Sequence, residues 1–314
     1  MRTVKVKGMK TIYDPKEPLE FESVATIGIF DGVHTGHRKI IDTIKKEAET
    51  KGLSSLVVTF YPHPQAVITG KTLPMIIPLG KRFKLLEGAG VDAVVCFTFT
   101  EEFSRMTAKQ FVVDVLATRL RVKSLFVGPD FTFGRDREGD IELLERLGRC
   151  AGFEMHVVEP VSIDGSVVSS TAIRSLLEAG RVREASEYLG CPYVVDGRVV
   201  EGEKRGRTLG FPTANLATEW ELLPRVGVYA TLAHFEGARY PSMTNVGTRP
   251  TFGENELLIE THIFDFDRDI YGKSLTVEFV DRIRDEQKFA GVDALVAQIK
   301  KDSLKAREIA SSAL

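Results

Sequence analysis

The chain has 314 residues, of which 43% are hydrophobic, so it is long enough to form two domains with sizeable cores. Its formal net charge of −2 argues against a general nucleic-acid binder, which usually carries a basic excess. No apolar run is long enough for a transmembrane helix, and the N-terminal residues lack the apolar core of a signal peptide. The three widely spaced cysteines form neither a metal motif nor a disulfide framework. We therefore expect a cytoplasmic protein that binds neither nucleic acid nor membrane.

The first part of the chain alternates strand-like and helix-like patterns, which is typical of a parallel sheet covered by helices. The strand-like runs are residues 25–30, 55–60, 93–99, 124–127 and 154–158. The helical patterns are residues 36–51, 81–88, 108–120, 141–150 and 171–178. Gly52 is expected to end the first of these helices, and Thr107 to cap the third.

The pattern changes near residues 189–192, which read Leu-Gly-Cys-Pro. Beyond this point strand-like runs dominate, at residues 193–200, 228–235, 257–264 and 275–279. Apolar residues then recur at helical spacing, at Val292, Leu295, Val296 and Ile299. Several strands followed by one helix predict a small β-barrel. We expect two domains, 1–186 and 187–314.

Residues 28–37 read Gly-Ile-Phe-Asp-Gly-Val-His-Thr-Gly-His and join a predicted strand to a predicted helix. Open α/β sheets bind ligands at such turns, and helix N-termini attract phosphate. The imidazoles of His34 and His37 can donate hydrogen bonds to phosphate oxygens. Such a site can transfer a nucleotidyl group by positioning the substrates and stabilising charge. The alternative is that the histidines merely cap the helix, and the motif alone supports both interpretations about equally.

Residues 169–174 read Ser-Ser-Thr-Ala-Ile-Arg and also precede a helical pattern. Hydroxyl groups at a helix N-terminus and an arginine in its first turn can bind phosphate, which assigns this role to Ser170, Thr171 and Arg174. The alternative is a plain N-cap, which Ser and Thr commonly provide. Two phosphate-type helix entries in one α/β domain together favour phosphate binding.

These two segments, with 60–64 and 127–134, resemble the nucleotidyltransferase module of the prokaryotic bifunctional riboflavin kinase/FAD synthetases. The resemblance implies a Rossmann-like parallel sheet of the nucleotidyltransferase type. It implies ATP binding by residues of both helix entries, namely Gly28, Phe30, Asp31, His34, His37, Ser170, Thr171 and Arg174. Within this set it assigns catalysis to His34, His37 and Arg174, and it places Asp130 and Phe131 at the flavin. Ile29 and Tyr61 depart from the polar and acidic residues that are common in the family.

The second half opens with a glycine-rich basic segment, residues 202–216. Its glycines let backbone N–H groups approach phosphate, and Lys204, Arg205 and Arg207 supply positive charge. Thr213 and Asn215 point the same way in an extended chain, and their oxygens suit Mg²⁺. The alternative is a basic surface loop that leads into a strand. It accounts for the charges but not for the ordered Pro-Thr-Ala-Asn sequence at 212–215.

Residues 257–264 predict a strand on which Glu260 and His262 share a face with Leu258 and Phe264. A carboxylate on an otherwise apolar face is costly unless it is paired or functional. Glu260 could act as a general base toward a substrate hydroxyl. The alternative, a rim position or an ion pair with an arginine such as 282 or 284, is about equally supported. His262 is interpreted as mainly structural.

These features, with 245–252, 271–272 and 279–284, resemble the riboflavin kinase module of the same family. The resemblance implies a six-stranded barrel with a C-terminal helix. It implies that Gly206, Arg207, Thr213 and Asn215 bind ATP, with Thr213 and Asn215 also holding Mg²⁺. It further implies that Glu260 activates the 5′-hydroxyl of riboflavin and that Asn245 and Arg282 contact the flavin.

The resemblance therefore predicts an enzyme with two activities, riboflavin kinase and FMN adenylyltransferase. The first makes FMN from riboflavin and ATP, and the second makes FAD and pyrophosphate from FMN and ATP. Two alternatives stay open: a nucleotidyltransferase with another phosphate acceptor, and a flavin-binding protein without catalysis. Members of the family associate, so a weak homo-oligomer is compatible with this prediction.

Overall fold

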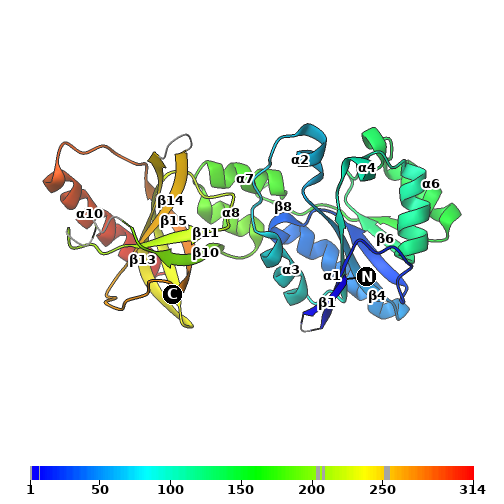
Figure 1. Ribbon diagram of the computed structural model, residues 1–314, viewed down its shortest axis with the longest axis horizontal. Coiled ribbons are helices and arrows are strands. Elements are labelled where there is room, and N and C mark those ends of the chain that lie inside the picture. The colour runs from blue at the N-terminus through cyan, green and yellow to red at the C-terminus, as the bar shows by residue number, and fades with distance from the viewer. Residues whose placement is uncertain (1, 7, 203–205, 207–208, 251–254) are drawn as a thin grey trace. The chain divides into compact units, whose positions relative to one another are not determined.

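The computed structural model describes the chain except for residues 1, 7, 203–205, 207–208 and 251–254 (Figure 1). It divides into two compact units, Met1–Val168 and Ser169–Leu314. The boundary expected after residue 186 lies inside a helix of the second unit, and the division into functional domains stays a prediction. In the part of the chain that the structure describes, no helix has the length and apolar character needed to cross a membrane.

The first unit is built from strands and helices that alternate along the chain. Its strands are β1 (Arg2–Val6), β2 (Met9–Tyr13), β3 (Ser23–Ile27), β4 (Ser54–Tyr61), β5 (Ala93–Thr98), β6 (Val122–Val127), β7 (Glu154–Val157), β8 (Ser162–Ile163) and β9 (Ser166–Val167). Its helices are α1 (Thr35–Lys51), α2 (Pro64–Thr69), α3 (Leu79–Gly88), α4 (Glu101–Ser104), α5 (Ala108–Gln110), the π-helix η2 (Phe111–Arg119) and α6 (Ile141–Ala151), with short 3₁₀ turns η1 (Asp31–Val33) and η3 (Arg135–Arg137).

Seven strands of this unit form one sheet in the order β1-β2-β5-β4-β3-β6-β7. Strands β2 to β7 pair in parallel, and only β1 pairs antiparallel. The chain leaves β3 toward β4 on one side and later returns to β6 on its other side, which makes the end of β3 a topological switch point. Ligands of open α/β sheets bind outside the carboxyl ends of strands at such points. The predicted phosphate turn at 28–37 begins directly after β3.

Local signals in the sequence explain most helix limits in this unit. Gly52 ends α1 with a φ of 65°, and Thr107 caps α5 in a capping box with Gln110, as expected. One helix differs from the prediction: the pattern at 108–120 is α-helical only over Ala108–Gln110 and then widens into a π-helix. The wider spacing is seen in the hydrogen bond from the Leu120 N–H to the Val115 carbonyl, five residues earlier, at 2.9 Å.

In its described residues, the second unit contains two helices, a closed barrel and a final helix. Its elements are α7 (Ser170–Glu178), α8 (Val182–Leu189), β10 (Tyr193–Val200), β11 (Ala214–Thr218), β12 (Gly227–Phe235), β13 (Ala238–Pro250), β14 (Asn255–Ile263), β15 (Ser274–Arg284) and α10 (Val292–Ser311). The antiparallel barrel runs β10-β11-β14-β13-β12-β15. The six-stranded barrel and the terminal helix are therefore confirmed. The sequence pattern alone missed β11, β13 and α8.

The barrel strands have two distinct faces. Inside, hydroxyl groups of Thr231, Thr244 and Thr261 form a buried chain of hydrogen bonds of 2.8 and 2.9 Å. Outside, Ala306 of α10 forms a small cluster with Ala230 and Phe264. Figure 1 shows α10 beside the strands of the barrel. Successive residues alternate between these faces, so a strand residue next to an interior threonine points toward the side that carries α10.

Candidate active sites

The first candidate site is the turn between β3 and α1. His34 is the N-cap of α1, and its Nδ1 accepts a hydrogen bond of 3.3 Å from the backbone N–H of His37. The two imidazoles stack with ring centroids 3.6 Å apart, and the centroid of the Phe30 ring lies 4.8 Å from that of His37. Gly36 makes room for this stack, since a Cβ there would lie 3.2 Å from the His34 ring. The capping role therefore belongs to His34, and its Nδ1 is committed to it.

Burial keeps both histidines neutral near pH 7. It lowers the pKa of His34 to about 4, and burial with the nearby His34 and Arg82 holds the pKa of His37 well below its ordinary value. Because Nδ1 of His34 is an acceptor, its proton lies on Nε2, which can donate to a ligand. Among the described residues, the buried Nδ1 of His37 has no hydrogen-bond partner. The pair can therefore donate hydrogen bonds to phosphate, but it brings no positive charge.

Hydrogen bonds of buried side chains support the same turn from the protein interior. The carboxylate of Asp31, which is 1% exposed, accepts hydrogen bonds from the backbone N–H groups of Ile76 at 3.0 Å and Ile77 at 3.3 Å. The buried Arg82 donates to the Ile29 carbonyl at 2.9 Å, as does the hydroxyl of Thr59 at 3.1 Å. These contacts fix both ends of the turn, and they place the Asp31 carboxylate toward the protein interior.

The other candidates of the first unit lie on loops. Asp130 is exposed in the loop after β6, and Phe131 beside it is partly buried with its ring stacked on Phe133 at 5.7 Å. Gly134 closes this loop against α5, because a Cβ there would lie 2.7 Å from the Ala108 backbone nitrogen. His63 is the N-cap of α2 and accepts a hydrogen bond from the Gln65 N–H at 3.1 Å. The structure thus gives His63 a structural role in the turn.

The Ser-Ser-Thr-Ala-Ile-Arg segment starts helix α7 of the second unit. The Ser169 side chain is the N-cap and accepts a hydrogen bond from the Ala172 N–H at 3.1 Å. Ser170 and Thr171 occupy the first turn, and Arg174 is buried in the next. Since Ser169 supplies the cap, the hydroxyls of the two following residues are not needed for it. A joint role with His34 and His37 stays a prediction, because the two segments belong to different units.

The second candidate site is a cavity of about 660 Å³ between the outer face of the barrel and α10. This volume lies in the range of small-molecule sites. Its lining includes the sequence candidates Gly206, Thr213, Asn215, Asn245 and Glu260. The cavity therefore brings together five residues that lie up to 54 positions apart in the sequence.

Strand register explains how the cavity is assembled. Glu260 pairs with Asn215 on one side and with Asn245 on the other, and Asn245 pairs with Val228, which pairs with Arg284. These five residues form one row across β11, β14, β13, β12 and β15, and all of them line the cavity. Asn215 is 7% exposed, and Gly202 makes room for it, since a Cβ there would lie 2.3 Å from its Nδ2. In this row the residue with the carboxylate thus lies between the two residues with amide side chains.

Thr213 connects this cavity with a second one. A smaller cavity of about 370 Å³ lies at the barrel mouth, and Thr213 lines both. His262 fixes the chain at this point: its Nδ1–H donates to the Pro212 carbonyl at 2.8 Å, and its ring packs edge-on against Phe211 and Phe264. Burial lowers the pKa of His262, which suits a neutral donor. This geometry supports the structural interpretation of His262.

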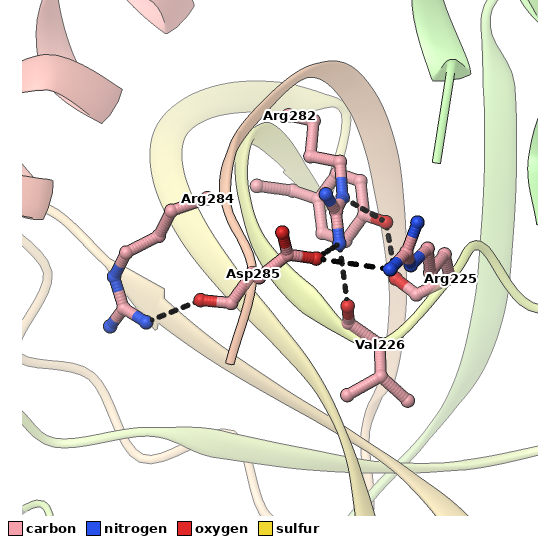
Figure 2. A network of polar contacts seen from close by, with 6 residues as sticks. Arg225, Val226, Arg282, Arg284 and Asp285 are labelled. Carbon is pink, nitrogen blue, oxygen red and sulfur yellow. Dashed lines mark hydrogen bonds and ion pairs between the residues drawn. The ribbon is translucent and has the colours of Figure 1, made fainter. Parts of the chain in front are cut away.

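The two arginines of the last strand have different surroundings. Arg284 lines the cavity and donates through Nε to the buried Asp302 carboxylate of α10 at 2.8 Å. Arg282 instead donates to the Val226 carbonyl at 2.7 Å and to Asp285 at 2.8 Å, within the group of contacts in Figure 2. The structure therefore brings Arg284 to the cavity wall and places Arg282 among internal contacts. Sequence reasoning had considered Arg284 only as an ion-pair partner.

Gly206 of the glycine-rich segment also lines the larger cavity. Gly206 accepts hydrogen bonds from the N–H groups of Leu209 and Phe211, and a Cβ on Gly206 would lie 2.4 Å from the Phe211 carbonyl oxygen. The chain therefore folds back closely at Gly206, beside the cavity. The predicted ATP ligand Arg207 lies outside the described residues.

Comparison with known proteins agrees with this two-part architecture. Residues 16–172 match the family model described as FAD synthetase, and residues 189–310 match the one described as riboflavin kinase. The chain is similar to bifunctional riboflavin kinase/FMN adenylyltransferases of Pseudomonas fluorescens (39% identity over 92% of this chain and 93% of the relative) and Escherichia coli K12 (38% over 96% and 97%). The Bacillus subtilis enzyme of that name is 39% identical over 95% of this chain and 97% of its own length.

A solved structure matches the fold over the same extent. It is a crystal structure described as a macrolide-efflux protein from Streptococcus pneumoniae. It aligns with a TM-score of 0.85 and 34% identity, over 95% of this chain and 98% of its own length.

Proposed function

Because the chain belongs to the bifunctional riboflavin kinase/FMN adenylyltransferase family, we propose that its two candidate sites catalyse the two successive steps of flavin cofactor synthesis. The chain is an enzyme that phosphorylates riboflavin with ATP to give FMN. It then transfers AMP from a second ATP to FMN, which gives FAD and pyrophosphate. The two family models do not favour either of the two alternatives, which were another phosphate acceptor and a flavin-binding protein without catalysis.

The observation that carries the kinase proposal is the row of Asn215, Glu260 and Asn245 on the wall of the large cavity. Glu260 accepts the proton of the riboflavin 5′-hydroxyl as its oxygen attacks the γ-phosphorus of ATP. The bond from that phosphorus to the β,γ-bridging oxygen breaks, and ADP leaves. Asn245 on the neighbouring strand contacts the flavin. Its amide can donate and accept hydrogen bonds with a polar ring edge.

Two cavities that meet at Thr213 suit two substrates that react with each other. We assign the flavin to the cavity of about 660 Å³ and the nucleotide to the smaller one at the barrel mouth, with Gly206 and Arg207 at its phosphates. The γ-phosphate then lies near Thr213, within reach of the hydroxyl that Glu260 activates. This arrangement brings the reacting atoms together by position alone, which accounts for a large part of the rate enhancement in phosphoryl transfer.

The donor set at this junction fits Mg²⁺. Thr213 offers a hydroxyl and Asn215 an amide oxygen, both hard neutral ligands of the kind that Mg²⁺ accepts beside water and substrate phosphate. The close approach of Gly202 to the Asn215 amide fixes that side chain in the wall. When bound there, Mg²⁺ would neutralise negative charge on the phosphate oxygens of ATP. Thr213 and Asn215 would hold it, and Glu260 would remain the base.

The adenylyl-transfer step uses the turn after β3. A phosphate oxygen of FMN attacks the α-phosphorus of ATP, and pyrophosphate leaves. The FMN phosphate is already ionised near neutral pH, so no base is required. His34 and His37 donate hydrogen bonds from neutral imidazoles. We assign the positive charge to Arg174, and Ser170 and Thr171 add hydroxyl donors at the entry of the same helix, α7.

The remaining ligands of this site are proposed from the family. Gly28 and Phe30 shape the nucleotide side of the turn, and Asp130 and Phe131 lie at the flavin. Asp31 belongs to the same motif, and its carboxylate supports the turn through the backbone of 76–77. The net charge of −2 and the small-molecule substrates fit a cytoplasmic enzyme without a nucleic-acid partner, and a weak homo-oligomer is compatible with the family.

One incubation tests the proposal. The purified chain is mixed with riboflavin, Mg²⁺ and ATP, and the flavins are separated by chromatography over time. We expect riboflavin to pass through FMN to FAD. Accumulation of FMN alone would contradict the assigned acceptor of the first unit. Flavin binding without any conversion would contradict catalysis altogether.

A further inference from the structure

Arg282 of β15 lies at the centre of a group of internal contacts. Its Nη2 donates to the Val226 carbonyl at 2.7 Å and to Asp285 Oδ1 at 2.8 Å. Its Nε donates to the Tyr229 hydroxyl at 3.3 Å, and its guanidinium carbon lies 5.8 Å from the Tyr229 ring. The side chain is 19% exposed. An arginine with three polar partners and a ring contact is held in one geometry.

The same contacts reach helix α7 through the loop before β12. The Tyr229 hydroxyl donates to the Arg225 carbonyl, and the Arg225 side chain lies 3.6 Å from Asp285 (Figure 2). The backbone N–H of Arg225 donates to the Leu177 carbonyl at 2.9 Å, in the last turn of α7. One chain of hydrogen bonds therefore joins Arg282 to the end of α7.

The turn between α7 and α8 also packs directly against the arginine. Gly180, with a φ of 77°, lies so close that a Cβ would be 2.6 Å from both Cδ and Nε of Arg282 and 3.1 Å from the Tyr229 hydroxyl. Both the backbone angle and the space demand glycine at this position. Arg183 of α8 adds an ion pair with Asp281 at 2.7 Å, one residue before Arg282. The α7–α8 turn and α8 thus each contact β15 directly, and the end of α7 contacts the loop before β12.

On its other side the arginine adjoins the wall of the kinase cavity. Asp285 connects the two arginines of the last strand: its carboxylate accepts from Arg282 and its carbonyl accepts from Arg284 at 2.8 Å (Figure 2). Arg284 lines the cavity and is held by Asp302. Arg282 therefore lies between the cavity wall and the α7–α8 turn.

We propose that Arg282 is a positioning residue for adenylyl transfer: it fixes helix α7 to strand β15 and so sets the position of Ser170, Thr171 and Arg174. The inference rests on the proposed function, which assigns these three residues to the nucleotide phosphates. It makes the unit that contains the barrel a structural requirement of adenylyl transfer. Arg282 touches no substrate, and its effect passes through the Gly180 turn and the Leu177 carbonyl.

The test measures the Michaelis constants of adenylyl transfer in the full-length chain with FMN and ATP. Arg282→Ala should raise KM for ATP about five- to tenfold, the equivalent of about 1 to 1.4 kcal/mol, and leave KM for FMN within about twofold. Arg282→Lys should restore part of the loss, since a lysine can still reach one carbonyl or carboxylate. Arg307→Ala is the matched control, because it removes an arginine–aspartate pair and a ring contact elsewhere on the same unit. It should leave both constants unchanged.

Gly180→Ala perturbs the same contact from the turn between α7 and α8. It provides a second test if Arg282→Ala folds poorly. It should raise KM for ATP in adenylyl transfer, and the increase should be smaller in the Arg282→Ala background, where the overlapping side chain is gone. Strictly additive effects would overturn the inference. So would an unchanged KM for ATP in folded Arg282→Ala. A selective rise in KM for riboflavin in the kinase reaction would do the same, because it would indicate direct flavin binding.

Arg174→Ala separates this inference from the proposed function. It should weaken ATP binding in adenylyl transfer more strongly than Arg282→Ala does. If Arg174→Ala has no effect, the assignment of the α7 residues to phosphate is wrong, and the positioning role of Arg282 is wrong as well. If Arg174→Ala is impaired and Arg282→Ala is not, only the positioning role is wrong.

Discussion

The two candidate sites are assembled in opposite ways. The turn after β3 takes its chemistry from neighbouring residues, since His34 and His37 stack within one helix entry. The barrel cavity takes Asn215, Glu260 and Asn245 from three strands and aligns them only through register. A contiguous site keeps its local geometry as long as its turn holds. A site built from register depends on every strand pair between its members.

Glu260→Ala should separate the two reactions most sharply. Loss of a general base typically costs up to about 10⁴-fold in rate, so FMN formation should fall by about 10³-fold or more. Added FMN should still be converted to FAD, because the residue belongs to the cavity of the second unit. The measurement is a pair of single-reaction assays on one preparation, with Glu260→Gln as the variant that keeps the shape. Loss of both activities in folded protein would contradict two separate sites.

His37→Ala should give the converse result. Removal of one preorganised donor to a reacting phosphate costs about 10²- to 10³-fold, so adenylyl transfer should fall by that factor while riboflavin phosphorylation continues. The same pair of assays applies, and His37→Gln, which retains a side-chain N–H, should keep more activity than alanine. If glutamine and alanine behave alike, hydrogen-bond donation by this residue is not its contribution.

Acid should destabilise the turn that carries His34. Burial lowers the pKa of His34 to about 4, whereas an unfolded histidine titrates near 6.5. The unfolded state therefore binds the proton first as the pH falls, so the stabilising contribution is complete above pH 6.5 and is lost between 6.5 and about 4. The 2.5-unit difference corresponds to about 3 kcal/mol. Urea unfolding of the wild type and of His34→Asn, which can still cap the helix, should show a shallower pH dependence in the variant.

Sequence reasoning could anticipate the local geometry of the first site, for a physical reason. A strand, a glycine turn and a helix are local, so the residues of 28–37 carry their own geometry. Their protonation could not be predicted in the same way: the low pKa values of His34 and His37 arise from burial, which depends on the whole fold. The motif alone had left the histidines as either caps or phosphate donors, and His34 caps the helix through Nδ1 while its Nε2 remains a donor.

The last barrel strand shows where period-two reasoning fails. Two residues apart on a regular strand, Arg282 and Arg284 should share a face. A register shift lies between Val228 and Tyr229 on the partner strand, so Arg284 pairs with Val228 at the cavity and Arg282 with the buried Tyr229. Such a bulge re-aims side chains and leaves no clear mark in a single sequence. This is why strand alternation did not place Arg284 on the cavity wall. The flavin contact of Arg282 was implied by the family resemblance and not by strand alternation.

Thr213→Val makes the smallest change, and it tests the point where the two barrel cavities meet. Valine keeps the shape of threonine and removes only the oxygen proposed to hold Mg²⁺. Asn215 and Glu260 remain, so KM for Mg–ATP in the kinase reaction should rise only about tenfold, or about 1.4 kcal/mol. Excess Mg²⁺ should recover part of the loss, and adenylyl transfer should not change. Thr213→Ser restores the oxygen and should restore the affinity. If Thr213→Ser is impaired and Thr213→Val is not, the methyl group, and not the hydroxyl, is what the kinase reaction requires.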